Sequence, residues 1–223
     1  MALHAAEEET IEALKKWWED NGTLVISVVA AGALLWGGWT FWQNSRETTV
    51  SAASDLYEEI LSLASASADG QVNEADRARI LSVAEALQTE YGDSSYALYG
   101  ALFAAQQAVN SNQLDVAERH LGWLLENAEG GFLGNTDEGL ILTATLRLGR
   151  VLLAQGDADR ALALVDSVDP GTFEADFAEL RGDIYLAQGR PVDARDAYTT
   201  ALESAAGANN FLQMKLDELS DET

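Results

Sequence analysis

Few side chains in this sequence have the type and spacing that chemistry at a protein site requires. The 223 residues include no cysteine and two histidines, which excludes disulfides, thiolate catalysis and cysteine-ligated zinc and disfavours a histidine-rich metal site. His120 lies among apolar residues in a helical pattern, which favours a partly buried structural histidine over a catalytic one. The acid pairs Glu58–Glu59 and Asp157–Asp159 suit solvated helix faces and helix N-termini better than general acid–base pairs.

The motifs of common enzyme classes are also absent from the sequence. It contains no G-x-S-x-G, no H-E-x-x-H, no phosphate-binding G-x-x-x-x-G-K-[ST] and no loop with the ligand spacing of a calcium site. We therefore predict a non-enzymatic protein without catalytic residues, cofactor or metal. Thirty-seven acidic residues against thirteen basic ones give a formal net charge of −24. Such a surface repels phosphate, so we predict no nucleic-acid partner.

The acidic residues are spread over the whole chain rather than gathered in one segment. A solvated surface of the kind found in halophilic proteins accounts for a general excess of acids, whereas a dedicated basic partner needs one concentrated patch. The spread favours the first explanation. Stabilisation of the soluble part by high salt would support it, and full stability at low salt would count against it.

The longest uncharged stretch of the chain lies between Asp20 and Arg46 and predicts a membrane span. Its core, residues 22–42, rises about 1.5 Å per residue as a helix and so covers roughly the 30 Å hydrocarbon core of a bilayer. Aromatic residues suited to the headgroup boundary flank it: Trp17, Trp18, Trp39, Phe41 and Trp42. A buried core helix is the alternative, and a cleaved signal peptide is disfavoured because an acidic segment precedes the apolar run.

The basic residues beside this stretch predict its orientation. Lys15 and Lys16 come directly before it and Arg46 comes directly after it, so the positive-inside rule places the N-terminus in the cytoplasm. We predict a short cytoplasmic segment over residues 1–21, a transmembrane helix over 22–42 and a domain over 43–223 on the other side of the membrane.

The remainder of the chain contains an internal repeat. Residues 142–168 align with residues 175–201 at a shift of 33. The shift superposes two Leu-Ala-Gln-Gly tetrads, 153–156 and 186–189, and pairs Gly149 with Gly182, Leu152 with Tyr185, and Ala161 with Ala194. In each unit a small residue permits a close helix crossing and a glycine ends the first helix in the left-handed conformation. This pattern resembles the tetratricopeptide repeat, a pair of antiparallel helices.

Weaker signals extend the repeat in both directions. Residues 98–125 form an earlier unit, two helical stretches at 47–66 and 74–91 precede it, and an amphipathic stretch at 209–219 is suited to cap the last unit. The glycine-rich segment 127–139 predicts a surface loop or a partner-contacting loop. We therefore predict an all-α protein, with a single N-terminal transmembrane helix followed by a tetratricopeptide-like α-solenoid of about four helical hairpins and a C-terminal capping helix.

The concave face of such a solenoid is formed by the first helix of each hairpin and commonly binds proteins. The repeat register places six residues there, which we predict as a candidate protein-binding groove: Tyr99, Leu102, Gln106, Leu146, Arg150 and Leu153. The corresponding face of the last unit is acidic, with Asp176, Glu179 and Asp183. The alternative is that some of these side chains pack internally or contact only water. Arg150 is the most distinctive, because it is a cation on a mainly acidic molecule.

Four segments together resemble a known bacterial family, the ancillary subunits of the SecYEG translocon. They are the acidic start and its junction with the span (7–22), the segment YGDSSYALYGALFAAQQAV (91–109), the repeat pair (147–165 with 179–189) and the ending FLQMKLDELS (211–220). The resemblance implies an inner-membrane, single-pass protein with a periplasmic domain. It also implies association with SecYEG and with a membrane-anchored periplasmic chaperone of the prolyl-isomerase-like type, in handling secreted proteins. The strong acidity departs from the family.

Two classes of function therefore stay open. The first is a chaperone-like adaptor that binds the translocon and secreted client proteins. The second is a scaffold that uses the same groove in a different cell-envelope assembly, such as a cell-wall or outer-membrane machine.

Overall fold

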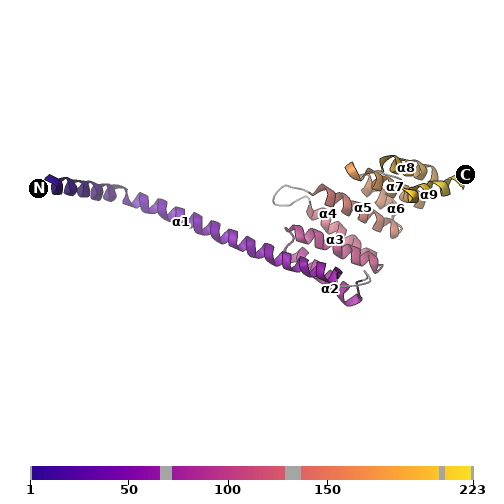
Figure 1. Cartoon of the computed structure of the whole chain (residues 1–223), viewed down its shortest axis with the longest axis horizontal. Coiled ribbons are helices and arrows are strands. Elements are labelled where there is room, and N and C mark those ends of the chain that lie inside the picture. Colours follow the sequence, from indigo (N-terminus) through magenta and orange to yellow (C-terminus); the bar gives the residue numbers. More distant parts are fainter. Residues whose placement is uncertain (1, 66–71, 129–136, 206–208, 222–223) are drawn as a thin grey trace. The chain divides into compact units, whose positions relative to one another are not determined.

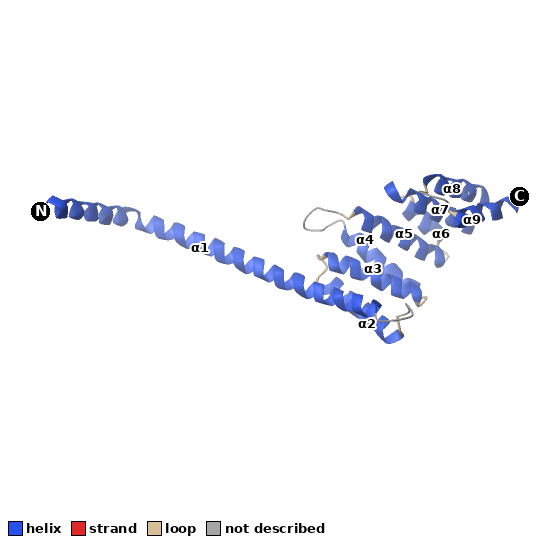
Figure 2. Cartoon of the chain, in the orientation of Figure 1, coloured by secondary structure: helices blue, strands red, loops and turns tan. Residues whose placement is uncertain are grey.

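A computed structural model describes residues 2–65, 72–128, 137–205 and 209–221, and these residues form helices joined by short turns, with no strand among them (Figures 1 and 2). The predicted all-α class is confirmed. The chain divides into two compact units, of which one ends at Ser51 and the other begins at Ala52. Most of the predicted loop at 127–139 lies outside the described residues.

The first unit lies within one long helix, whose last residues belong to the second unit. Helix α1 (Ala2–Ser65) contains the stretch Leu14–Thr40, which is long and apolar enough to cross a membrane. Its large side chains are exposed: Leu34 by 77%, Leu35 by 76% and Trp36 by 78%. The hydroxyls of Ser27 and Thr40 donate to carbonyls one turn earlier in the same helix, so these polar groups need no water. The helix continues past the predicted span without a break and takes in the helical stretch predicted to begin at residue 47.

The second unit contains the end of α1 and a series of shorter helices, each packed against the next from α2 onward (Figure 1). They are α2 (Glu74–Glu90), α3 (Ser95–Asn110), α4 (Leu114–Ala128), α5 (Glu138–Ala154), α6 (Ala158–Val165), the 3₁₀ turn η1 (Gly171–Phe173), α7 (Glu174–Ala187), α8 (Pro191–Ser204) and α9 (Asn210–Asp221). The end of α1 packs through Ala53 and Ile60 into a core with α2 and α3. Among the described residues, four hairpins and a last capping helix therefore follow the predicted order.

Helix ends follow from side chains in the turns. Asn73, Ser94, Asp137 and Asp157 each accept a hydrogen bond from a backbone N–H of the first turn of α2, α3, α5 and α6, respectively. The two tetrads of the repeat end their helices identically. Gly156 and Gly189 have φ of +86° and +71°, and the backbone hydrogen bonds of the Schellman motif close both helix ends.

The paired glycines of the repeat lie at close helix crossings. A Cβ atom built at Gly182 would lie 2.3 Å from Tyr198 Cε1, and one at Gly149 would lie 2.9 Å from Leu180 Cδ2. Tyr198 is fully buried. At each position a side chain of a neighbouring helix fills the space that the glycine leaves open, which explains why a small residue recurs at this position of the repeat.

Candidate functional site

The six residues predicted for the groove lie on two helices, α3 and α5, which both pack against α4. The structure brings two of them together: Gln106 and Arg150 line one pocket. Leu146 is 5% exposed and belongs to the core, and Leu102 and Leu153 are half-buried against that core. Tyr99 lies in a different recess.

The pocket that contains Gln106 and Arg150 has a volume of about 320 Å³. We call it the α3–α5 pocket, and its lining residues are Ala105, Gln106 and Val109 of α3, Leu114 and Leu121 of α4, and Arg147, Arg150, Val151 and Ala154 of α5. Small alanines on both facing helices leave the space open, and aliphatic side chains from all three helices form most of its walls. The pocket thus combines an apolar lining with two guanidinium groups.

The electrostatics of this pocket differ from the rest of the domain. Arg147 is half-buried and Arg150 is exposed, and within the described ranges neither has a hydrogen bond or an ion pair. Burial, followed by the neighbouring Arg150 charge, lowers the pKa of Arg147. Five other arginines of the domain pair with acids: Arg79 with Glu59, Arg119 with Asp115, Arg160 with Glu118 and Asp157, Arg181 with Asp166, and Arg190 with Asp193.

Arg147 was not among the predicted groove residues. Its spacing from Arg150 carried the signal, because residues three apart lie on one face of a helix. The spacing does not indicate whether an acid pairs with these arginines, because that depends on the packing of α3 and α4 against α5.

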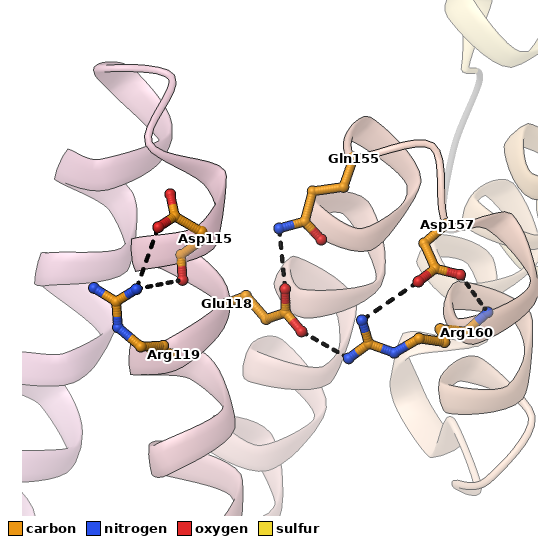
Figure 3. Close-up of polar contacts among 6 residues, drawn as sticks. All are labelled: Asp115, Glu118, Arg119, Gln155, Asp157 and Arg160. Carbon is orange, nitrogen blue, oxygen red and sulfur yellow. Dashed lines mark hydrogen bonds and ion pairs between the residues drawn. The ribbon is translucent and has the colours of Figure 1, made fainter.

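Polar contacts between successive hairpins explain one feature that the two repeat units share. Gln155 of the first tetrad donates to Glu118 Oε2 at 3.0 Å, and Arg160 donates to Glu118 Oε1 at 2.6 Å (Figure 3). These hydrogen bonds, that of Arg160 first, lower the pKa of Glu118. In the next unit the tetrad residue Gln188 donates to Asp159 at 2.8 Å. The repeated glutamine therefore ties the end of each first helix to an acid of the preceding second helix.

Tyr99 lies in a second recess, of about 210 Å³, near the start of α5. Its hydroxyl donates to Asp137 Oδ2 at 2.9 Å, and this hydrogen bond, followed by burial, raises the pKa of Tyr99. The ring also belongs to an aromatic cluster around Tyr57, which lies 5.6 Å from Tyr96 and 6.1 Å from Phe103 between ring centroids. The cluster joins the end of α1 to α3.

The acidic face predicted for the last unit is partly occupied by the capping helix. Lys215 Nζ of α9 lies 2.9 Å from Glu179 and 2.6 Å from Asp183. The Tyr198 hydroxyl also donates to Asp183, at 2.6 Å. Glu179 and Asp183 thus hold α9 against α7 and α8, while Asp176 is exposed.

The described side chains do not form a cluster of three or more histidine or acidic groups that could hold a metal ion. His120 is buried, and its Nδ1 lies 2.9 Å from Gln88 Nε2. Because the amide nitrogen is a donor, Nδ1 accepts and the ring is neutral in this contact. Burial lowers the pKa of His120.

Comparison with known proteins covers both units of the chain. Residues 15–221 match the family described as a tetratricopeptide repeat-like domain. A protein of Neisseria gonorrhoeae is 34% identical, with 98% of this chain and all of the relative aligned, and one of Escherichia coli is 28% identical, with 99% and all aligned. A relative in Haemophilus influenzae is also 28% identical over 98% of this chain and its own full length. All three are named ancillary SecYEG translocon subunit. No solved structure matches the chain.

Proposed function

This chain belongs to the family of ancillary SecYEG translocon subunits, and from that premise we propose that it is a non-enzymatic, membrane-anchored adaptor of the translocon. Its tetratricopeptide-like domain assists secreted or envelope proteins through protein–protein contacts as they emerge into the periplasm. The observation that carries the proposal is the extent of the similarity. Relatives with this name align over the apolar part of α1 and over the domain alike.

The proposed topology combines the apolar helix with the charge asymmetry beside it. Residues 1–21 lie in the cytoplasm, 22–42 cross the inner membrane once, and 43–223 lie in the periplasm. The exposed large side chains of Leu14–Thr40 support a lipid environment, because such an apolar surface is unfavourable in water. Lys15 and Lys16 before the span, against Arg46 after it, support a cytoplasmic N-terminus.

The proposed partners are SecYEG, a membrane-anchored periplasmic chaperone of the prolyl-isomerase-like type, and secreted client proteins. We assign contact with SecYEG to the span and its flanks. Contact with clients is assigned to the groove residues that keep exposed or half-exposed surface: Tyr99, Leu102, Gln106, Arg150 and Leu153. Leu146 supports this surface from the core.

A pull-down of the full-length protein from its own membranes in mild detergent, followed by mass spectrometry, tests the proposal. The matched control replaces residues 22–42 with an unrelated apolar segment of equal length, so that membrane anchoring is kept and only the span sequence changes. We expect SecYEG subunits and a periplasmic chaperone with the native span, and loss of SecYEG with the replaced span. Enrichment of a different envelope machine without SecYEG would contradict the proposal and favour the scaffold function.

A further inference from the structure

Arg147 and Arg150 carry two neighbouring guanidinium groups that form no ion pair with an acid among the described residues, on a chain with a net charge of −24. Arg147 and Arg150 follow each other by one helical turn and both line the α3–α5 pocket. Because like charges on neighbouring turns repel, and because Arg147 is half-buried, the pair is less stable here than two solvated arginines would be. A carboxylate placed between them would relieve both effects and could accept hydrogen bonds from both planar groups.

The rest of the pocket is lined mainly by apolar side chains. Val109, Leu114, Leu121 and Val151 provide an aliphatic lining beside the guanidinium groups. The volume of about 320 Å³ is at the lower end of the range for ligand pockets, roughly 300–1,000 Å³. It can therefore receive one or two side chains of a partner rather than a folded element. A fitting segment has one acidic side chain and, beside it, one apolar side chain.

We propose that the α3–α5 pocket binds an internal segment of a client protein through one Asp or Glu side chain, held by Arg147 and Arg150, and a neighbouring apolar side chain, held by the aliphatic lining. This inference rests on the proposed function and names the client chemistry of the same groove. An internal acid is the occupant, rather than a C-terminal carboxylate, because a chain that is still emerging from a channel presents its internal segments before its C-terminus.

The acidity of the domain does not oppose this contact at physiological salt. The Debye length there is about 8 Å, so acids farther than this from the pocket are largely screened. The acids near other arginines are already paired with them, as Glu118 is with Arg160 at 2.6 Å. A bound carboxylate therefore experiences chiefly the two guanidinium groups in direct contact with it.

Fluorescence anisotropy with the full-length protein in detergent micelles tests the inference. The first probe is a short labelled peptide with an internal Glu beside a Leu, amidated at its C-terminus. The second has Gln in place of Glu, and the third is the Gln peptide with a free C-terminal carboxylate. We expect the Glu peptide to bind about tenfold or more tightly than either Gln peptide, because a charge-assisted pair is lost in each of them.

Arginine variants locate the binding site. Arg147→Gln and Arg150→Gln should each weaken binding of the Glu peptide by about tenfold, and Arg119→Gln should leave it unchanged, because Arg119 lies outside the pocket and is paired with Asp115. If Arg147→Gln lowers the melting temperature, the exposed Arg150 still provides the test. Equal binding of the Glu and Gln peptides, preference for the free C-terminus, or unchanged binding by both pocket variants would overturn the inference.

Two further results separate this inference from the proposed function. If SecYEG co-purifies with the wild type but no peptide preference is found, the inference fails and the proposed function stands. If the Glu peptide binds as expected but SecYEG does not co-purify, the proposed function fails while the pocket chemistry is supported. Dimerisation that is abolished by Arg150→Gln, without peptide binding, would place a second copy of the chain in the groove and would also overturn the inference.

Discussion

The chain has two apolar regions, and they keep their apolar side chains out of water in different ways. In the domain, side chains such as Ile60 and Leu87 have no exposed surface and pack against specific neighbours. In Leu14–Thr40, side chains such as Leu34 are exposed along most of the helix, so their surroundings come from outside the chain. The span should therefore tolerate changes of shape but not of charge, whereas the domain should be sensitive to both.

Charge introduced into the span is the substitution with the largest expected effect. Val29→Arg together with Leu35→Arg puts two cations on either side of the centre of the predicted span, 22–42, at a cost of about 2.5–3.5 kcal/mol each on insertion scales. We expect most of the protein to leave the membrane fraction on alkaline carbonate extraction. The control, Val29→Leu with Leu35→Val, changes shape alone and should stay in the membrane. Full retention of the arginine variant would contradict the assignment of this stretch as a span.

A single methyl group provides the complementary test in the domain. At Gly182 a Cβ atom would lie 2.3 Å from the buried ring of Tyr198, and the hydrogen bond from that ring to Asp183 restricts its movement. We expect Gly182→Ala to lower the free energy of unfolding by about 3 kcal/mol, measured by urea denaturation of the full-length protein in micelles. Gly37→Ala is the matched control, because nothing lies within 4 Å of a Cβ at that position. Similar effects of the two substitutions would remove the proposed difference between the regions.

Features that depend on neighbouring residues in the sequence were predictable. Local geometry specifies helix ends at Gly156, at Gly189 and at the first-turn Pro191. The structure has a helix end at each of these positions. A third helix end with the left-handed residue of the Schellman motif was not predicted from the sequence. Asn112 takes the left-handed conformation there, with φ of +57°, and asparagine is a weaker sequence signal than glycine.

Features that depend on distant residues were not predictable. Leu146 was placed on the groove but is buried, because a small rotation of α5 decides which of its apolar residues face inward. Lys215 pairs with Glu179 across 36 residues, which the repeat register does not indicate. Whether Arg147 and Arg150 form ion pairs with other described residues likewise depends on which acids the fold brings near them. The helical architecture thus followed from the sequence, whereas the electrostatics of the groove required the structure.

Removing the contact between Lys215 and the acids of α7 should lower the free energy of unfolding by less than Gly182→Ala does. Lys215→Met removes a cation that is 18% exposed and leaves Glu179 and Asp183 without it. We expect the free energy of unfolding to fall by about 2 kcal/mol, because two partly buried carboxylates lose their cation. Arg119→Met is the control: its pair with Asp115 is largely exposed and should contribute at most about 1 kcal/mol. The free energy of unfolding by urea measures both losses, and equal losses would mean that the Lys215 contacts stabilise the domain no more than an exposed ion pair does.

The smallest expected effect concerns the one histidine inside the domain, where burial excludes charge much as a bilayer does. The pKa of His120 is lowered by burial from its usual 6.5, so the unfolded chain binds a proton at higher pH than the folded chain does. The stabilisation by neutral His120 is therefore complete above about pH 6.5 and is lost as the pH falls from there through the folded-state pKa. Its hydrogen bond with Gln88 at 2.9 Å requires the same neutral ring.

Urea denaturation between about pH 7.5 and 5.5 measures this dependence, since carboxylates in the folded and unfolded chain stay largely ionised over most of that range. We expect the wild type to lose stability toward the acidic end. In His120→Asn, which cannot titrate at this position, the part of the pH dependence that is due to His120 should disappear. The rest of the change in unfolding free energy with pH should stay the same. Identical slopes would mean that the imidazole gains a proton in the folded domain as readily as in the unfolded chain. The domain interior would then tolerate a charge that the span cannot, and the exclusion of charge would be a property of the membrane region alone.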